Sequence, residues 1–76
     1  MIRELDTVVL TRDLPEHDLR EGDVGAVIHR YVDGAAYEVE FATAEGGTVA
    51  VLTLHEDEVR PMVTGEILHV RAMDAA

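Results

Sequence analysis

The chain has 76 residues, 16 acidic side chains and six arginines, which give a formal net charge of −10. It contains no cysteine and no lysine. The lack of cysteine excludes disulfides and thiolate metal sites, and the charge disfavours binding to nucleic acid, whose phosphates are neutralised by lysine and arginine. No apolar run reaches the roughly 18 residues of a membrane span, and the N-terminus does not read as a secretory signal. We therefore expect one cytoplasmic domain that binds neither nucleic acid nor membranes.

The first part of the chain predicts a strand followed by a long loop. Residues 5–11 are rich in β-branched and apolar side chains, which favour a strand. Residues 12–23 are acidic, and Pro15 disfavours both a continuing strand and a long helix there. We expect an ordered loop that Leu14 and Leu19 pin to the core, with a single helical turn around residues 15–20 as an alternative.

The middle of the chain predicts two paired strands. Residues 24–31 form the first of these, and Gly25 marks an expected bulge, because glycine within a strand often does so. An Asp-Gly turn leads into YEVEF (37–41), where apolar and polar residues alternate. We expect Tyr37, Val39 and Phe41 to face the core.

The last strands and the tail are less regular. Residues 48–54 are apolar on both faces, which predicts a central strand or one covered by another segment. A short final strand follows at Val59 and Arg60, and Pro61 borders it. The tail, residues 62–76, predicts an extra strand, a short helix or a partly disordered segment, and the second face of the 48–54 strand is a candidate docking place for it.

Short strands separated by turn residues predict an all-β fold. The expected architecture is a small five-stranded SH3-like barrel over residues 1–61, followed by the tail. The expected core comprises one of the pair Val8 and Val9 together with Leu10, Val27, Tyr37, Val39, Phe41, Val51, Leu54 and Val59.

Several stretches together resemble a bacterial family of short proteins catalogued as domain of unknown function 4926. They are the VVLTRDLP start, the GDVG turn, YEVEF and the TL…DEVRP ending, and the likeness covers residues 2–61. The resemblance implies an SH3-like barrel without an established activity, so it transfers no catalytic or binding residues. The GD-x-G-x-V turn is also similar to the KOW-type motif of ribosomal and transcription-factor barrels, but that motif occurs in basic proteins.

The residue types offer little for catalysis or metal binding. The four histidines, at positions 17, 29, 55 and 69, lack the spacing of metal-ligand pairs. The carboxylates lie in polar loops, where ionised surface groups are expected, and a short barrel offers little walled pocket. We therefore expect no enzyme activity, no cofactor and no metal.

The acidic side chains concentrate in two loops, which an SH3-like topology would bring to one end of the barrel. The candidate protein-interaction residues are Asp13, Glu16, Asp18, Glu21, Asp57 and Glu58. The leading hypothesis is a non-enzymatic interaction module for a more basic protein, such as the neutralising partner in a toxin–antitoxin or immunity pair. The alternative is an accessory or subunit-like barrel of a metalloenzyme. Homodimerisation through the tail also stays open, and the charge has a simpler explanation in solubility.

Overall fold

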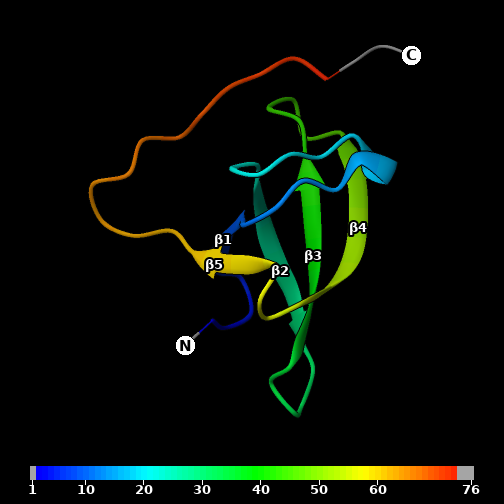
Figure 1. Cartoon of the computed structure of the whole chain (residues 1–76), viewed down its shortest axis with the longest axis vertical. Coiled ribbons are helices and arrows are strands. Elements are labelled where there is room, and N and C mark those ends of the chain that lie inside the picture. The colour runs from blue at the N-terminus through cyan, green and yellow to red at the C-terminus, as the bar shows by residue number, and fades with distance from the viewer. Residues whose placement is uncertain (1, 74–76) are drawn as a thin grey trace.

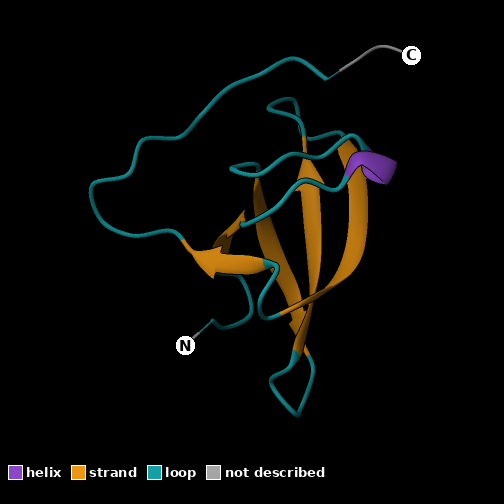
Figure 2. Ribbon diagram, in the orientation of Figure 1, coloured by secondary structure: helices purple, strands orange, loops and turns teal. Residues whose placement is uncertain are grey.

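A computed structural model describes residues 2–73, and these form one curved antiparallel sheet (Figure 1). Its strands are β1 (Thr7–Leu10), β2 (Val24–Arg30), β3 (Ala36–Ala42), β4 (Thr48–His55) and β5 (Val59–Pro61). The strand order is β4-β3-β2-β1-β5. One 3₁₀ turn, η1 (Pro15–His17), interrupts the loop between β1 and β2 (Figure 2). The all-β, five-stranded prediction is therefore confirmed.

The core lies on one face of this sheet. Tyr37, Val39 and Phe41 alternate inward along β3 and are 6%, 0% and 2% exposed, which confirms the predicted facing of that strand. In Figure 1, β5 runs at a steep angle to β3 and β4, so the sheet curves around the buried side chains. The core cluster consists of Ile2, Val8, Leu10, Leu14, Leu19, Val27, Tyr37, Val39, Phe41, Leu54 and Val59.

One expectation about the core needs correction. Val51 was expected inside but is 45% exposed, because it pairs with Glu40 and shares the outer face of the sheet. A register shift after Phe41 turns Val49 inward instead, where it packs against the core. Of the pair Val8 and Val9, one was expected in the core, and Val8 belongs to the core cluster whereas Val9 is buried outside it.

Gly25 was expected at a β-bulge, and this position is wrong. The irregularity in β2 lies between Val27 and His29, where the pairing with β3 shifts by one residue. Gly25 is needed for a different reason: a Cβ atom there would lie 2.7 Å from Val39 Cγ1 and 2.9 Å from Phe41 Cε1. The absence of a side chain lets the two core residues of β3 approach the backbone of β2.

The loop between β1 and β2 is held at its base as predicted. Leu14 and Leu19 form an isolated antiparallel bridge and are each 3% exposed. Pro15 begins η1, and Asp18 ends it with a left-handed φ of 57°. The two buried leucines anchor this polar loop to the core, while the carboxylates of Asp13, Glu16, Asp18 and Glu21 stay exposed.

The tail beyond Pro61 leaves the sheet and returns to it. In Figure 1 it makes a wide arc from the end of β5 to the opposite end of the sheet. Residues 62–73 contain neither a helix nor a strand, and the last three positions of the predicted tail lie outside the described residues. Within the described chain, no helix is both long and apolar enough to cross a membrane.

Candidate functional site

The site is centred on Asp23, the last residue before β2. A tight turn fixes this residue: Arg20 N–H donates to Asp23 Oδ2 at 2.8 Å, and Asp23 N–H donates to the Arg20 carbonyl at 3.0 Å. Gly22 supplies the turn with a φ of 94°, which other residues rarely adopt. The Asp23 carbonyl also accepts Leu10 N–H of β1. The backbone therefore presents the Asp23 carboxylate in one orientation, with only 8% of the residue exposed.

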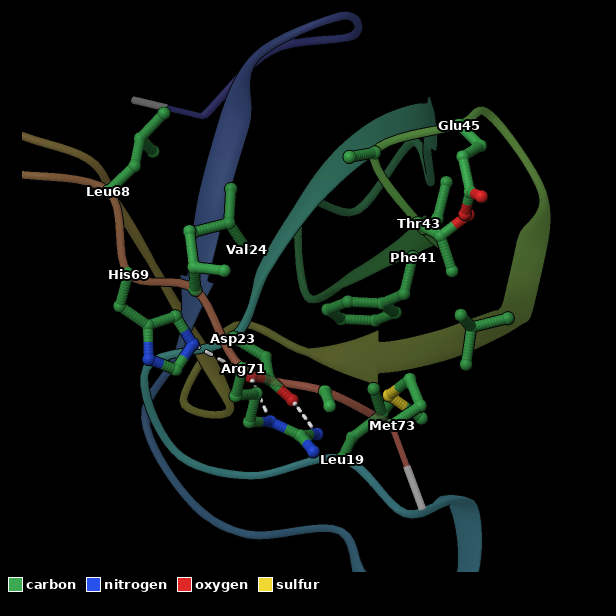
Figure 3. Close-up of a pocket in the computed structure, with 15 residues that line it drawn as sticks. Leu19, Asp23, Val24, Phe41, Thr43, Glu45, Leu68, His69, Arg71 and Met73 are labelled. Atoms are coloured by element: carbon green, nitrogen blue, oxygen red, sulfur yellow. Dashed lines mark hydrogen bonds and ion pairs between the residues drawn. The ribbon is translucent and has the colours of Figure 1, made fainter. Parts of the chain in front are cut away.

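The tail brings a guanidinium to this carboxylate (Figure 3). Arg71 Nε donates to Asp23 Oδ1 at 2.9 Å, and Nη2 donates to Oδ2 at 2.6 Å. Nη2 also donates to the backbone carbonyl of Asp18 at 2.7 Å. Two parallel N–H···O bonds are the strong, geometrically specific form of an arginine–carboxylate pair. We call the Asp23 carboxylate and the Asp18 carbonyl together the arginine site.

His69, two residues earlier in the tail, completes the contact. Its Nε2 lies 2.9 Å from Asp23 Oδ1. The imidazole is more exposed than the guanidinium, with 43% and 17% of the respective side chains accessible. The histidine therefore flanks the arginine site, while the arginine fills it.

The electrostatics of Asp23 follow from these neighbours. Burial by itself would raise the pKa of this carboxyl, but hydrogen bonds from Arg71, from the Arg20 backbone and from His69 outweigh burial and lower it to about 2. Asp23 is consequently ionised across the physiological range. An ionised, largely buried carboxylate requires a paired cation, because a lone buried charge is costly.

An apolar pocket of about 610 Å³ adjoins the arginine site, between the tail and the sheet. Side chains of the β1–β2 loop, β2, β3 and β4 line one wall, and tail residues line the other (Figure 3). The sheet wall includes Leu19, Val24, Phe41 and Val49, and the tail wall includes Leu68 and Met73. We call this space the tail groove.

A second contact holds the beginning of the tail. Arg60 of β5 and Glu66 form a bidentate pair, with N···O distances of 2.9 and 2.6 Å. Glu66 Oε1 also accepts Val63 N–H at 2.8 Å. The hydrogen bond from Arg60 is the main cause that lowers the pKa of Glu66 to about 2. The tail is thus fixed near residue 66 and again at residues 69–71.

The structure places the six predicted interaction residues around the loop that carries the arginine site. Asp13 Oδ1 accepts Glu21 N–H at 2.8 Å, so these two residues are neighbours. The turn before β5 joins the same loop, because Thr11 donates its N–H to the Glu58 carbonyl and its hydroxyl to the Asp57 carbonyl. Glu16 and Asp18 lie at η1 and are exposed. Of the six, only Asp18 belongs to the arginine site, and it contributes a backbone carbonyl.

Sequence reasoning missed Asp23, His69 and Arg71 as site residues. Asp23 was taken as part of a turn, and the candidate docking place for the tail was the second face of the 48–54 strand, not the loop before β2. One signal was present, since Arg71 is the only arginine in the last fifteen residues and lies among apolar neighbours. The pairing itself joins residues 48 positions apart, and no local pattern encodes such a contact.

The other residues considered as metal ligands do not form a cluster in the described part of the chain. Among residues 2–73, no group of three or more histidine and carboxylate side chains is arranged to hold a metal ion. His29 packs edge-to-face on Tyr31, with 4.8 Å between ring centroids, at the far end of β2 from Asp23.

Comparison with known proteins identifies a family and no activity. Neither the curated proteins nor the solved structures contain a match to this chain. One family model, for a domain of unknown function (DUF4926), matches residues 4–61. The matched region contains Asp18 and Asp23 but ends before the tail that carries Arg71. The chain belongs to the DUF4926 family.

Proposed function

We propose that this protein is a non-enzymatic interaction module that binds an extended, arginine-bearing segment of a more basic protein. The observation that carries this proposal is the arginine site itself, where the body of the domain holds the Arg71 guanidinium by Asp23 and Asp18. The site lies within the family region, whereas the arginine that fills it comes from outside that region.

The chemistry of the site selects arginine over lysine. The Asp23 carboxylate and the Asp18 carbonyl together accept three hydrogen bonds from one side chain, through Nε and Nη2. Only a planar guanidinium offers several donors in this fixed arrangement, and a lysine ammonium acts as a point charge. Although burial raises the pKa of Asp23, hydrogen bonds led by that of the Arg71 guanidinium lower it to about 2, so an arginine bound at the site keeps the carboxylate ionised at every physiological pH.

The surroundings of the site select an extended segment. The tail that fills it has no helix or strand between residues 62 and 73. The neighbouring tail groove offers apolar surface from Leu19, Val24 and Phe41 to side chains that flank the arginine. A segment with an arginine and nearby apolar residues satisfies both features, as the sequence from Leu68 to Met73 does.

The charge of the chain supports a basic protein as the source of that segment. The formal charge of −10 attracts basic proteins over distances of about a Debye length. The exposed carboxylates of Glu16, Asp18 and Glu21 lie on the loop that forms the arginine site. The specific form of this proposal is the neutralising partner in a toxin–antitoxin or immunity pair, in which a small acidic protein binds a basic one. We place this role in the cytoplasm, because a chain without cysteine suits a reducing compartment.

The tail competes with a partner for this site. Because it is attached to the same chain, its effective concentration at the site is in the millimolar range typical of short linkers. A variant whose tail lacks the arginine therefore exposes the site for measurement. Arg71→Ala in the full chain is that variant.

The test is binding of a fluorescent peptide of residues 66–73 to the full-length Arg71→Ala protein, followed by anisotropy. We expect binding that weakens by about tenfold or more when the peptide carries the same Arg71→Ala change, as expected for hydrogen bonds to a charged group. Asp23→Asn in the protein should weaken binding similarly, whereas Asp33→Asn, a matched change at an exposed carboxylate in the β2–β3 turn, should not. Equal binding of the two peptides would overturn the proposal.

A further inference from the structure

β4 forms one end of the sheet and pairs only with β3. Its eight residues, Thr48–His55, make it the longest strand. In Figure 2 it bounds the sheet on the side opposite to β5. A strand in this position carries a row of backbone groups that no neighbouring strand satisfies.

The pairing with β3 shows which groups these are. Glu56 N–H donates to the Ala35 carbonyl, so these two residues form a hydrogen-bonded pair. Leu54 and Leu52, opposite Tyr37 and Val39, are separated from Glu56 by even numbers of residues and are therefore hydrogen-bonded positions as well. In an antiparallel pair, hydrogen-bonded positions alternate with positions whose backbone groups point away. Val51 and Thr53 therefore direct their N–H and C=O groups to the free edge. No backbone hydrogen bond from another segment of residues 2–73 reaches those groups.

From Ala50 to Leu54 the β4 edge lacks the features that normally prevent strands from pairing, and its one irregularity, the register shift at Val49, lies before this stretch. Residues 48–54 contain no charged residue and no proline, and Val51 is 45% exposed. The opposite edge differs, since β5 has three residues, includes Pro61 and carries the Arg60 pair with Glu66. Charged residues, proline and short length are the usual protections of an edge strand, and only β5 has them.

We propose that β4 pairs antiparallel with β4 of a second copy of this chain, about a two-fold axis at Val51. In that register each Val51 faces the other and Ala50 faces Leu52. Val49, at the register shift of β4, comes opposite Thr53, so the regular pairing spans residues 50–52. Each residue of this stretch then meets an uncharged residue. The two sheets become one continuous sheet, and the outward backbone groups of Val51 are satisfied in both copies.

A second copy fits this edge better than a basic partner does. Residues 48–54 carry no charge that would attract a basic strand, whereas the sequence TVAVLTL opposes itself without conflict when centred on Val51. The two valines at the axis also form a cross-strand pair on the outer face, which contributes to sheet stability. The proposal uses a surface separate from the arginine site and does not depend on the proposed function.

The charge of the whole chain predicts that dimerisation depends on the salt concentration. Two copies with a formal charge of −10 each repel one another, and salt screens that repulsion. One pair of strands buries a small interface, so the dimer is weak. Association should therefore strengthen as salt rises, which is opposite to the behaviour of an acidic protein that binds a basic partner.

The test is sedimentation equilibrium of the full-length protein between about 0.01 M and about 1 M salt, over which the Debye length falls from about 30 Å to about 3 Å. We expect the dimer fraction to rise with salt. Val51→Lys should abolish the dimer, because it places like charges opposite each other at the axis. Val32→Lys makes the same change of charge at a fully exposed valine in the β2–β3 turn and should preserve the dimer.

Amide hydrogen exchange gives a second readout that does not depend on a variant. Protection of the Val51 amide should rise with protein concentration at high salt, while the Leu52 amide, which already bonds to β3, should not change. A protein that stays monomeric at high salt, or equal loss of the dimer in the Val51 and Val32 variants, would overturn the proposal.

Discussion

Arg71 Nη2 lies 2.6 Å from Asp23 Oδ2, although the two residues are 48 positions apart in the sequence. This contact ties a tail without helix or strand to the loop that precedes β2. It also joins the part of the chain inside the family match to a part outside it. The function proposed for the protein depends on this relationship, since the same carboxylate that holds the tail would hold a partner.

The Asp23 pair predicts a specific pH dependence of stability. The pKa of Asp23 in the folded protein, about 2, lies below its ordinary value of 3.8, so its ionised form stabilises the fold by about 2 kcal/mol above pH 3.8. This contribution should decline as the pH falls towards 2. Chemical unfolding of the wild type and Asp23→Asn, followed by circular dichroism, should show a difference near neutral pH that shrinks on acidification. A difference that is constant down to pH 2 would contradict the lowered pKa.

Phe41→Ala tests the facing of β3. The ring is 2% exposed in the core, and its removal should lower the free energy of unfolding by about 3–5 kcal/mol. Val63→Ala, at a tail valine that is 57% exposed, should change it by less than about 0.5 kcal/mol. Urea unfolding measures both variants, and similar small losses in the two would show that Phe41 is not part of the core.

Gly25→Ala tests the close approach of β2 and β3. The added Cβ would meet Val39 and Phe41 side chains below 3.0 Å and the Glu40 carbonyl at 3.0 Å. Overpacking of this kind should cost about 1–3 kcal/mol, although alanine otherwise suits a strand better than glycine. Gly47→Ala is the control, because a Cβ there would meet only the Thr43 hydroxyl, at 3.3 Å. An unchanged melting temperature for Gly25→Ala would exclude the tight packing.

Glu66→Gln tests the contact that holds the beginning of the tail. It should weaken the bidentate pair with Arg60 and the hydrogen bond from Val63 N–H. We expect faster exchange of the Val63 amide, with little change in global stability because Arg60 and Glu66 are at the surface. Since the pKa of Glu66 is about 2, the wild-type protection of Val63 should persist to acidic pH. Exchange of Val63 that is identical in the two proteins would disprove this role of Glu66.

Much of the fold was predictable because local patterns encode it. The alternation of Tyr37, Val39 and Phe41 with glutamates identifies the buried face of β3 from sequence alone. The pinning of the acidic loop by Leu14 and Leu19 was predictable for the same reason, since they are its only large apolar residues. The position of Val51 was not, because residues 48–54 are apolar on both faces, and only the pairing of Val51 with Glu40 shows which face is buried. Val49 packs against the core because of the register shift after Phe41, which depends on the pairing of two strands.

The candidate site was much less predictable. The sequence predicted the acidic loop as an interaction region through its exposed carboxylates. It did not predict a role for Asp23, which is buried. Asp23 acquires its role from a turn that fixes its carboxylate and from Arg71, which reaches it through the arc of the tail. Both conditions arise only in three dimensions.

The most direct test of the arginine site is a double-mutant cycle in the full-length protein with Asp23→Asn, Arg71→Gln and the combined variant. Unfolding free energies from denaturant titrations give the coupling between the two side chains. If Asp23 and Arg71 form the hydrogen bonds of the arginine site, the coupling should be favourable by about 1.5–3 kcal/mol, the range for hydrogen bonds to charged groups. Additive effects of the two substitutions, with no coupling beyond experimental error, would contradict it.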